Sequence, residues 1–484
     1  MPAANPPAQL YNKALVGWLS VAQLIGWGSV FYLFAQVMAP VEQALQVGRA
    51  QTSLAFSLCL LMDGLLAYPV GRLIDRGHER LVMTLGSLTL AAGLALHSQV
   101  NNLWAFYAVW MLLGTGMAAT LYAPVFAVVT RRFPHDFRRA IITMTFLGGL
   151  ASTVFIPLTA WLITLLGWRH SLLVLAVLNL LVCAPLHWKW LKNAPLTVAG
   201  SWHDSVNKAD FEDENAAGNA GAAALGTAAV GTAALGNSQT QTLAQASVTP
   251  PQSAPSVSSA PPAPPASPGD NNLPLAHHLQ SRVYWLIGLG LAGLSLATSA
   301  LPSHMLALLR EYGLSETWVV LIPASIGALQ VVGRLVLYFF EQYFDVHAAN
   351  RIIPCLLPLG LGFLLVAPWV AAPHSQLMLG CCLLFVLLWG MGNGMLTIVK
   401  GTAMAQYVSR VHVASLNGAL GFPMALLRAS APLVLGLLWN LQTGYRNGLL
   451  FMMAMALLGA GALALAQRLA LRGGLDGGGQ GGAG

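Results

Sequence analysis

Apolar stretches of about twenty residues, separated by short polar breaks, recur along almost the whole chain. At 1.5 Å per residue, a helix of this length crosses the hydrocarbon core of a bilayer. The pattern therefore predicts twelve membrane-spanning helices. Their expected ranges are 16–40, 52–73, 82–99, 103–129, 140–166, 170–190, 284–308, 317–340, 352–372, 377–404, 413–439 and 447–469.

One long segment, 195–281, interrupts this pattern after the sixth helix. It consists largely of Ala, Gly, Ser, Thr and Pro, and it cannot bury a core, so a disordered cytoplasmic linker is expected. The fold class that follows is an all-α membrane protein with two pseudo-symmetric bundles of six helices. The bundles are expected at 1–194 and 282–470, and residues 471–484 form a glycine-rich tail that is also expected to be disordered.

The basic residues predict the orientation of the helices. Lys and Arg are retained on the cytoplasmic side during insertion. With the N-terminus inside, fourteen basic residues near helix ends lie on the cytoplasmic side, and four lie on the opposite side, namely Arg49, Arg169, Arg310 and Arg446. Both termini are therefore expected to be cytoplasmic.

Composition agrees with a protein whose solvent is lipid. Of its 484 residues, 56% are hydrophobic and 8% are charged, whereas a soluble protein carries about a quarter of its residues as charged side chains. The net charge of +7 is spread singly between apolar runs, which argues against nucleic-acid binding. The five cysteines lie in apolar runs without paired spacing, so neither a metal site nor a cofactor is expected.

Short glycine motifs recur at the same ordinal places of the two halves. Such an internal repeat places a substrate site between the halves, near the middle of the membrane. The three pairs are Gly71-Arg-Leu73 with Gly333-Arg-Leu335, Gly114-x-Gly116 with Gly390-x-Gly392, and Gly167-Trp-Arg169 with Gly444-Tyr-Arg446.

The loop after the second predicted helix reads GRLIDRGHER. It resembles the G-x-L-x-D-R-x-G-x-R loop of the major facilitator superfamily of secondary transporters. In that family the charged loop is thought to latch one end of the transporter and to open during the cycle. The resemblance implies a gating loop made by Gly71, Leu73, Asp75, Arg76, Gly77 and Arg80.

Within that family, residues 392–402 and 416–418 resemble the tenth and eleventh helices of a bacterial branch that includes monocarboxylate porters and oxalate:formate antiporters. Related anion porters place an arginine where Arg334 stands and a cation on the helix of Arg428. Two guanidinium groups facing one cavity would form a fork-shaped receptor for a carboxylate. Arg334 could instead mark only the cytoplasmic end of its helix.

Two further ionisable residues lie in predicted membrane helices, where charge is costly and each is a candidate for function. Asp63 could bind and release a proton, or it could be a fixed counter-ion for a neighbouring cation. Lys400 could belong to the same site or could extend toward the headgroups near a helix end. Smaller polar candidates, each of which could equally serve helix packing, are Tyr32, Gln36, Tyr122, Gln330 and Asn393.

These features favour secondary transport of a small, monocarboxylate-like organic anion by alternating access, coupled to a proton or to exchange. The alternatives are export of drug-like or hydrophobic compounds and, in another class, a membrane receptor that binds without transporting. No nucleotide-binding loop or catalytic cluster is evident in the sequence, so an enzyme is not expected. The expected setting is the bacterial inner membrane, with the bilayer, the substrate and a proton or counter-anion as partners of a monomer.

Overall fold

The computed structural model describes residues 12–133, 136–192, 275–340, 346–370, 375–409 and 413–477, which belong to one compact unit. Nearly all of them are helical, and the single β-type pairing among them is a bridge between Asn440 and Gly444. The predicted all-helical class is therefore confirmed. Most of the predicted linker, and residues 478–484 of the predicted tail, lie outside the described residues.

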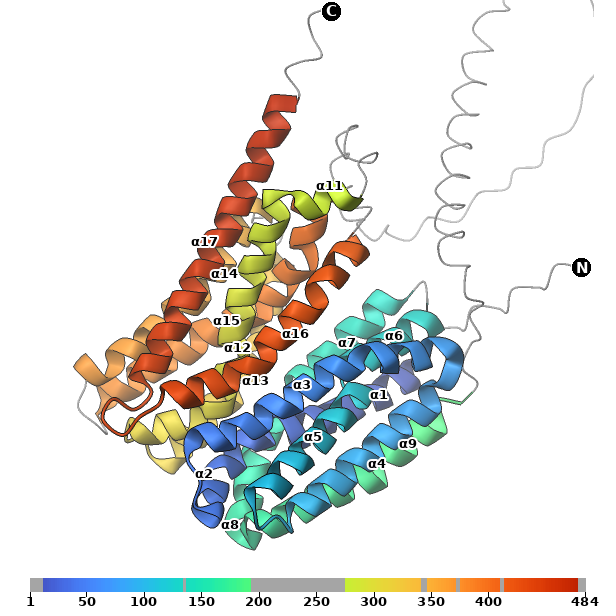
Figure 1. The fold of residues 1–484 in the computed structure, drawn as a ribbon, viewed down its shortest axis with the longest axis vertical. Coiled ribbons are helices and arrows are strands. Elements are labelled where there is room, and N and C mark those ends of the chain that lie inside the picture. The colour runs from blue at the N-terminus through green and yellow to red at the C-terminus, as the bar shows by residue number, and fades with distance from the viewer. Residues whose placement is uncertain are drawn as a thin grey trace, which may run out of the picture. The chain divides into compact units, whose positions relative to one another are not determined.

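The first half contains six crossings, several of them interrupted (Figure 1). Its elements are α1 (Lys13–Gly26), a π-helical segment at Trp27–Phe31, α2 (Leu33–Leu45), α3 (Arg49–Leu73), a π-helical segment at Ile74–His78, α4 (Glu79–His97), α5 (Leu103–Thr120), α6 (Tyr122–Arg132), α7 (Phe137–Gly149), α8 (Ala151–Leu178), a π-helical segment at Asn179–Cys183, and α9 (Ala184–Trp190).

The second half is more regular. A short helix, α11 (Leu275–Gln280), precedes six long helices of 25 to 32 residues. These are α12 (Arg282–Glu311), α13 (Glu316–Phe340), α14 (Val346–Val370), α15 (Gln376–Tyr407), α16 (Val413–Leu438) and α17 (Arg446–Gly477). The last helix thus extends into the segment where a disordered tail was expected.

Ten helical runs of the described residues are long and apolar enough to cross a membrane. Two of them, Arg49–His97 and Arg139–Trp190, contain 49 and 52 residues, roughly twice the length of one crossing. Each contains a glycine with positive φ at which the chain turns, Gly77 at 86° and Gly167 at 76°. Counting each of these two runs twice gives twelve crossings, as the apolar pattern predicts.

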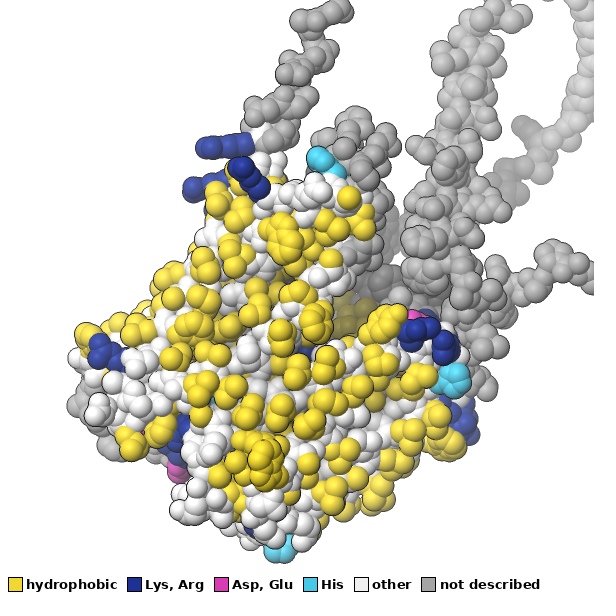
Figure 2. Space-filling model, viewed as in Figure 1, with side chains coloured by type: hydrophobic (Ala, Val, Ile, Leu, Met, Phe, Trp, Pro, Cys, Tyr) yellow, Lys and Arg dark blue, Asp and Glu magenta, His cyan; other side chains and the backbone are white. Residues whose placement is uncertain are grey.

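The outer surface of the crossings is apolar. Figure 2 shows hydrophobic side chains along the helices and Lys and Arg side chains gathered near their ends. Trp161, Leu165, Leu181 and Val366 are among the large apolar residues that are at least half exposed. Such a surface is stable only where lipid replaces water, so the chain is a multi-pass membrane protein.

The two halves meet along two helix pairs, α3 with α16 and α8 with α13. Small residues let these backbones approach closely. A Cβ atom on Gly64 of α3 would lie 2.9 Å from the Cβ of Ala425 in α16, and a Cβ on Gly327 of α13 would overlap the carbonyl oxygen of Gly149. Close contact through small residues is how membrane helices pack without a hydrophobic driving force.

Two of the three recurring glycine motifs have the same structural role in both halves. Gly167 and Gly444 both adopt positive φ at turns before the next crossing. Gly114 of α5 lies against the backbone of Cys59 in α3, and Gly390 of α15 lies against Leu329 in α13. The fourth helix of each half thus packs on the second helix through a glycine, which supports the predicted repeat.

We expect Gly114→Ala to destabilise the first half, because the added Cβ would overlap the Cys59 carbonyl oxygen, a backbone atom that cannot move aside cheaply. Overpacking of this kind costs about 1–3 kcal/mol. Thermal unfolding of the detergent-purified protein should show a lower midpoint for Gly114→Ala. Gly461→Ala is the matched control, since nothing lies within 4 Å of its added Cβ; equal midpoints for both variants would contradict the packing described.

Candidate functional site

Interruptions in the first and fourth crossings position two phenol side chains. Tyr32 directly follows the π-helical segment Trp27–Phe31, and Tyr122 begins α6 after the break at Leu121, where ψ is −157°. The rings of Trp27 and Tyr122 pack with their centroids 5.0 Å apart. A Cβ on Gly148 would overlap the Tyr122 hydroxyl, so the glycine leaves room for it.

Arg334 is the basic residue of α13, and the helix continues beyond it to Phe340. Its Nη1 donates to the carbonyl oxygen of Thr145 in the first half at 3.1 Å, and its Nε donates to the carbonyl oxygen of Gly394 at 3.4 Å. Both acceptors are neutral, and among the described residues no carboxylate pairs with this guanidinium. Arg334 is thus a half-buried cation held by backbone dipoles alone.

The same guanidinium is electrostatically coupled to Tyr32 and Tyr122. Gln330 lies half-buried one helical turn before Arg334. Asn393 is also half-buried and directly precedes Gly394, whose carbonyl oxygen accepts a hydrogen bond from Arg334. We call Arg334, Tyr32 and Tyr122 the Arg334 cluster. It draws on helices of both halves, as the internal repeat predicts for a substrate site.

Arg428 and Asp63 form an ion pair between the halves. Arg428 Nη2 of α16 lies 2.7 Å from Asp63 Oδ2 of α3, and the two side chains are 41% and 20% exposed. The contact is through one guanidinium nitrogen, and Arg428 Nε, although buried, has no hydrogen-bond partner. Arg428 therefore keeps donor capacity that Asp63 does not use.

Lys400 lies on α15, half-buried and near enough to Arg428 for their charges to interact. α15 continues for seven residues beyond it, to Tyr407. The structure thus brings the predicted site residues into two groups: the Arg334 cluster, and Asp63 with Arg428 and Lys400. Among the described residues, no hydrogen bond joins the two arginines directly.

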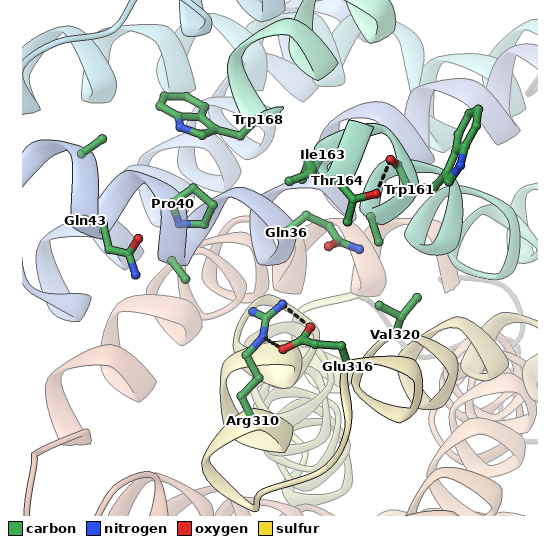
Figure 3. A pocket seen from close by; sticks show the side chains of 13 residues that line it. Gln36, Pro40, Gln43, Trp161, Ile163, Thr164, Trp168, Arg310, Glu316 and Val320 are labelled. Carbon is green, nitrogen blue, oxygen red and sulfur yellow. Dashed lines mark hydrogen bonds and ion pairs between the residues drawn. The ribbon is translucent and has the colours of Figure 1, made fainter. Parts of the chain in front are cut away.

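Gln36 lies in a separate pocket of about 790 Å³ (Figure 3). Its amide donates to the Ile156 carbonyl oxygen at 2.9 Å, and the pocket walls include Trp161, Trp168 and the Arg310–Glu316 ion pair at 2.8 Å. Because Gln36 follows Tyr32 by one turn of helix, this pocket and the Arg334 cluster adjoin the same stretch of the first crossing.

The predicted gating loop is a tight turn at one end of the helices, which we call the loop end. Gly77 has φ of 86°, one position before the second glycine of the family pattern. Arg80 Nε donates to the Trp188 carbonyl oxygen at 2.8 Å, and its guanidinium stacks 3.5 Å from the Trp188 ring centroid. Asp75 and Arg76 are exposed, and no ion pair of Asp75 is recorded within the described residues.

Glu79, which the sequence analysis did not single out, anchors this loop. Its side chain is fully buried, accepts from Arg132 Nε at 2.6 Å, and lies 3.4 Å from Arg131 Nη1. Arg131 also donates to the Ile74 carbonyl oxygen. All four residues belong to the first half. A sequence signal did exist, because Glu79 is an acidic residue at the first position of α4 and faces a pair of arginines at the end of α6.

At the opposite end, which we call the Arg49 end, a second ion pair joins the halves. Arg49 Nη1 of α3 lies 2.7 Å from Glu311 Oε1 of α12, and Arg49 Nε lies 3.5 Å from Glu42 Oε1. The Arg49 guanidinium stacks 4.2 Å from the Trp439 ring centroid, and Trp439 Nε1 donates to Glu311 at 2.7 Å. The sequence analysis used Arg49 only for orientation.

The arrangement is that of a membrane carrier made of two helical halves, with polar groups between them and an ion pair across one end. The sequence matches the family model of the Major Facilitator Superfamily over residues 16–432. The chain therefore belongs to the Major Facilitator Superfamily and is a transporter of that family.

Comparisons with individual proteins support the fold. The chain is 23% identical over 172 residues to the uncharacterised MFS-type transporter YcxA of Bacillus subtilis (strain 168), a match that covers 35% of this chain and 42% of that relative. A structure of a mutant of the nucleoside transporter NupG gives a TM-score of 0.61 at 14% identity, with 95% of this chain and 99% of that one covered.

A bacterial homologue of the human lysosomal transporter Spinster, in an inward-facing and occupied conformation, gives a TM-score of 0.62 at 13% identity, with 96% and 97% of the two chains covered. A structure from a study of proton-dependent oligopeptide transporters gives a TM-score of 0.62 at 14% identity, with 95% of this chain and 98% of that one covered. These likenesses establish the fold alone. They do not support the narrower resemblance to monocarboxylate porters and oxalate:formate antiporters.

We expect Glu79→Gln to destabilise the protein strongly, because it leaves two arginines facing a neutral amide in a buried site. Breaking a buried pair by removing one partner costs about 3–5 kcal/mol. Purified Glu79→Gln should unfold at a clearly lower temperature than the wild type, whereas the matched control Asp75→Asn, an exposed acid of the same loop, should not. Equal losses in the two variants would argue against this anchor.

Proposed function

We propose that this transporter moves a small organic anion across the bacterial inner membrane, and that Arg334 is the group that binds the anion. The observation that carries the proposal is the absence of a carboxylate partner for Arg334 among the described residues, while Arg428 has Asp63. A cation left between membrane helices without a counter-ion is unfavourable. An anionic substrate would supply the missing charge.

The chemistry of the Arg334 cluster suits a carboxylate. A guanidinium offers five donors in a fixed plane and binds a carboxylate through two parallel hydrogen bonds. Its present acceptors, the Thr145 and Gly394 carbonyl oxygens at 3.1 and 3.4 Å, are neutral and are readily outcompeted by a charged oxygen. The hydroxyls of Tyr32 and Tyr122 are further donors for an oxyanion.

Asp63 is, in this proposal, the fixed counter-ion of Arg428 and not the carrier of the coupling proton. The pair is neutral as a unit, so it admits an anion without adding charge to the path. Arg428 Nε has no hydrogen-bond partner among the described residues and is buried, so a second oxygen of the substrate reaches it only when the Arg428 side chain moves. Lys400 adds a second positive charge near Arg428.

The positions of the ion pairs between the two halves also support alternating access. At the Arg49 end the halves are joined by the pair of Arg49 with Glu311, and the Asp63–Arg428 pair joins them midway along α3 and α16. Figure 1 shows α3 and α16 diverging toward the loop end. With the orientation that the basic residues predict, the closed Arg49 end faces outward and the loop end faces the cytoplasm.

Export of cationic or hydrophobic compounds is the second candidate, because the Asp63 side chain is 20% exposed and could attract a cation. The structural neighbours do not decide between the two, since they include nucleoside and oligopeptide transporters. The charge balance favours the anion: Arg334 and Lys400 have no acidic partner among the described residues, and Asp63 has a basic one.

A thermal-stability screen of the purified protein against carboxylates should identify ligands that raise the unfolding midpoint, because a ligand stabilises the state it binds according to its occupancy. We expect Arg334→Gln to weaken binding of the best carboxylate at least about tenfold, since hydrogen bonds to charged groups contribute about 1.5–3 kcal/mol. Arg351→Gln, outside the site, is the matched control. Unchanged affinity in Arg334→Gln would overturn the assignment.

Asp63→Asn separates the two candidate functions. If Asp63 is only a counter-ion, its loss frees Arg428, and carboxylate binding measured by the same screen should be retained or strengthened. A cation exporter would instead lose binding and cellular resistance to cationic compounds in Asp63→Asn and keep both in Arg334→Gln. That second pattern would replace the anion proposal with export.

A further inference from the structure

A buried histidine lies directly beneath the ion pair that closes the Arg49 end. His304 of α12 is fully buried, and both of its ring nitrogens have partners. Nδ1 lies 2.9 Å from the Tyr445 hydroxyl, and Nε2 lies 3.0 Å from the Pro432 carbonyl oxygen and 3.2 Å from Ser53 Oγ. Of these partners, Ser53 alone belongs to the first half, so His304 is part of the contact between the halves.

The partners determine which ring nitrogen carries the proton. A carbonyl oxygen can only accept, so Nε2 carries hydrogen and donates to Pro432. Nδ1 of the neutral ring then accepts from the Tyr445 hydroxyl, and burial raises the pKa of Tyr445, which keeps that hydroxyl protonated. Ser53 Oγ donates to the Arg49 carbonyl oxygen at 2.7 Å. The neutral imidazole is therefore fully satisfied in the closed conformation.

Two features of the closed conformation oppose a second proton on the ring. Complete burial removes water from the charged form, and Arg49 lies close enough for its positive charge to act on the ring. Arg49 stacks 5.3 Å from the ring centroid of Tyr445, the residue that bonds to His304. Both features depend on α3, which is in the other half.

The remaining charged groups near His304 do not offset the effects of burial and of Arg49, which oppose a second proton on the ring. Glu311, seven residues along α12, and Glu42 of α2 are both committed to Arg49. On α16 the nearest charge is Arg428, one turn from Pro432 and paired with Asp63.

Four other helices pack on α12, and among the described residues their charged groups are paired, stacked or distant. Glu316 at the start of α13 is paired with Arg310, and Arg446 at the start of α17 stacks on Trp369. Lys400 lies in the part of α15 away from the Arg49 end, and α11, with His277 and His278, precedes the opposite end of α12.

We propose that His304 is a proton-binding site that couples proton uptake to opening of the Arg49 end. This rests on the proposed alternating-access cycle. When the halves separate at this end, α3 leaves with Ser53 and Arg49, so water reaches the imidazole and the repelling charge departs. At the same time Glu311 loses Arg49 and stays on α12, two helical turns from His304. The open end thus gains an unpaired carboxylate that a protonated His304 can balance.

The direction of the pH effect follows from linkage. The open conformation binds the proton more strongly than the closed one, so acidification on the outer side favours opening, and closing expels the proton. One coupled proton changes the ratio of open to closed by at most about tenfold per pH unit. The change sets in as the pH falls through about 6.5, the ordinary pKa of a histidine in water.

Distances between spin labels on the full-length protein in lipid nanodiscs test the proposal without any substrate. Cysteines for labelling would replace Ala44 and Gln442, exposed residues of opposite halves at the Arg49 end, with Cys355→Ser removing the exposed native cysteine. The population with long label distances should rise as the pH falls from 8 to 5. In His304→Gln, whose amide can still donate to Pro432 but cannot take a proton, the ratio should be independent of pH.

Two controls separate His304 from its neighbours. Glu311→Gln should shift the ratio at every pH but keep the pH dependence, and His97→Gln, a fully buried histidine of the first half, should leave both unchanged. A wild-type ratio that does not vary with pH, or a His304→Gln variant with the wild-type pH dependence, would overturn the proposal. His304→Asn serves with the same expectation if the glutamine variant does not fold. Neither result depends on Arg334 or on the substrate.

Discussion

The organisation of this transporter depends on how charges between membrane helices are neutralised, because lipid offers them no partner. Glu79 is held between Arg131 and Arg132, and Asp63 pairs with Arg428 at 2.7 Å. Arg334 departs from this pattern, as Lys400 does, since its guanidinium has only backbone carbonyl partners among the described residues. An anion binding there would complete the pattern that the rest of the protein follows.

Burial separates the permanent ion pairs from those that can break. The Glu79 carboxylate is 0% exposed and its partners belong to the same half, so opening it would leave charges buried without partners. Arg49 and Glu311 are 14% and 30% exposed and belong to different halves. Pairs that reach solvent contribute little, about 0–1 kcal/mol. In the proposed cycle, the weak pair therefore lies where the halves separate, and the strong one lies where the loop stays folded.

Much of the fold could be predicted from the sequence, because its determinants are local. The length of an apolar run sets the number of crossings, and positive φ at Gly167 and Gly444 explains why these glycines recur. The break at Leu121 was missed because a hydrophobic run continues through it.

The candidate site was predictable only in part. Arg334 and Arg428 stood out as charges in apolar helices, but their different partners depend on tertiary packing. Arg49 and Glu311 are 262 residues apart, and no local pattern pairs them. The most direct test is a structure of the transporter with a bound carboxylate. We predict the anion within hydrogen-bonding distance of the Arg334 guanidinium, with the Asp63–Arg428 pair intact; an anion bound away from Arg334, or in place of Asp63 at Arg428, would contradict the account.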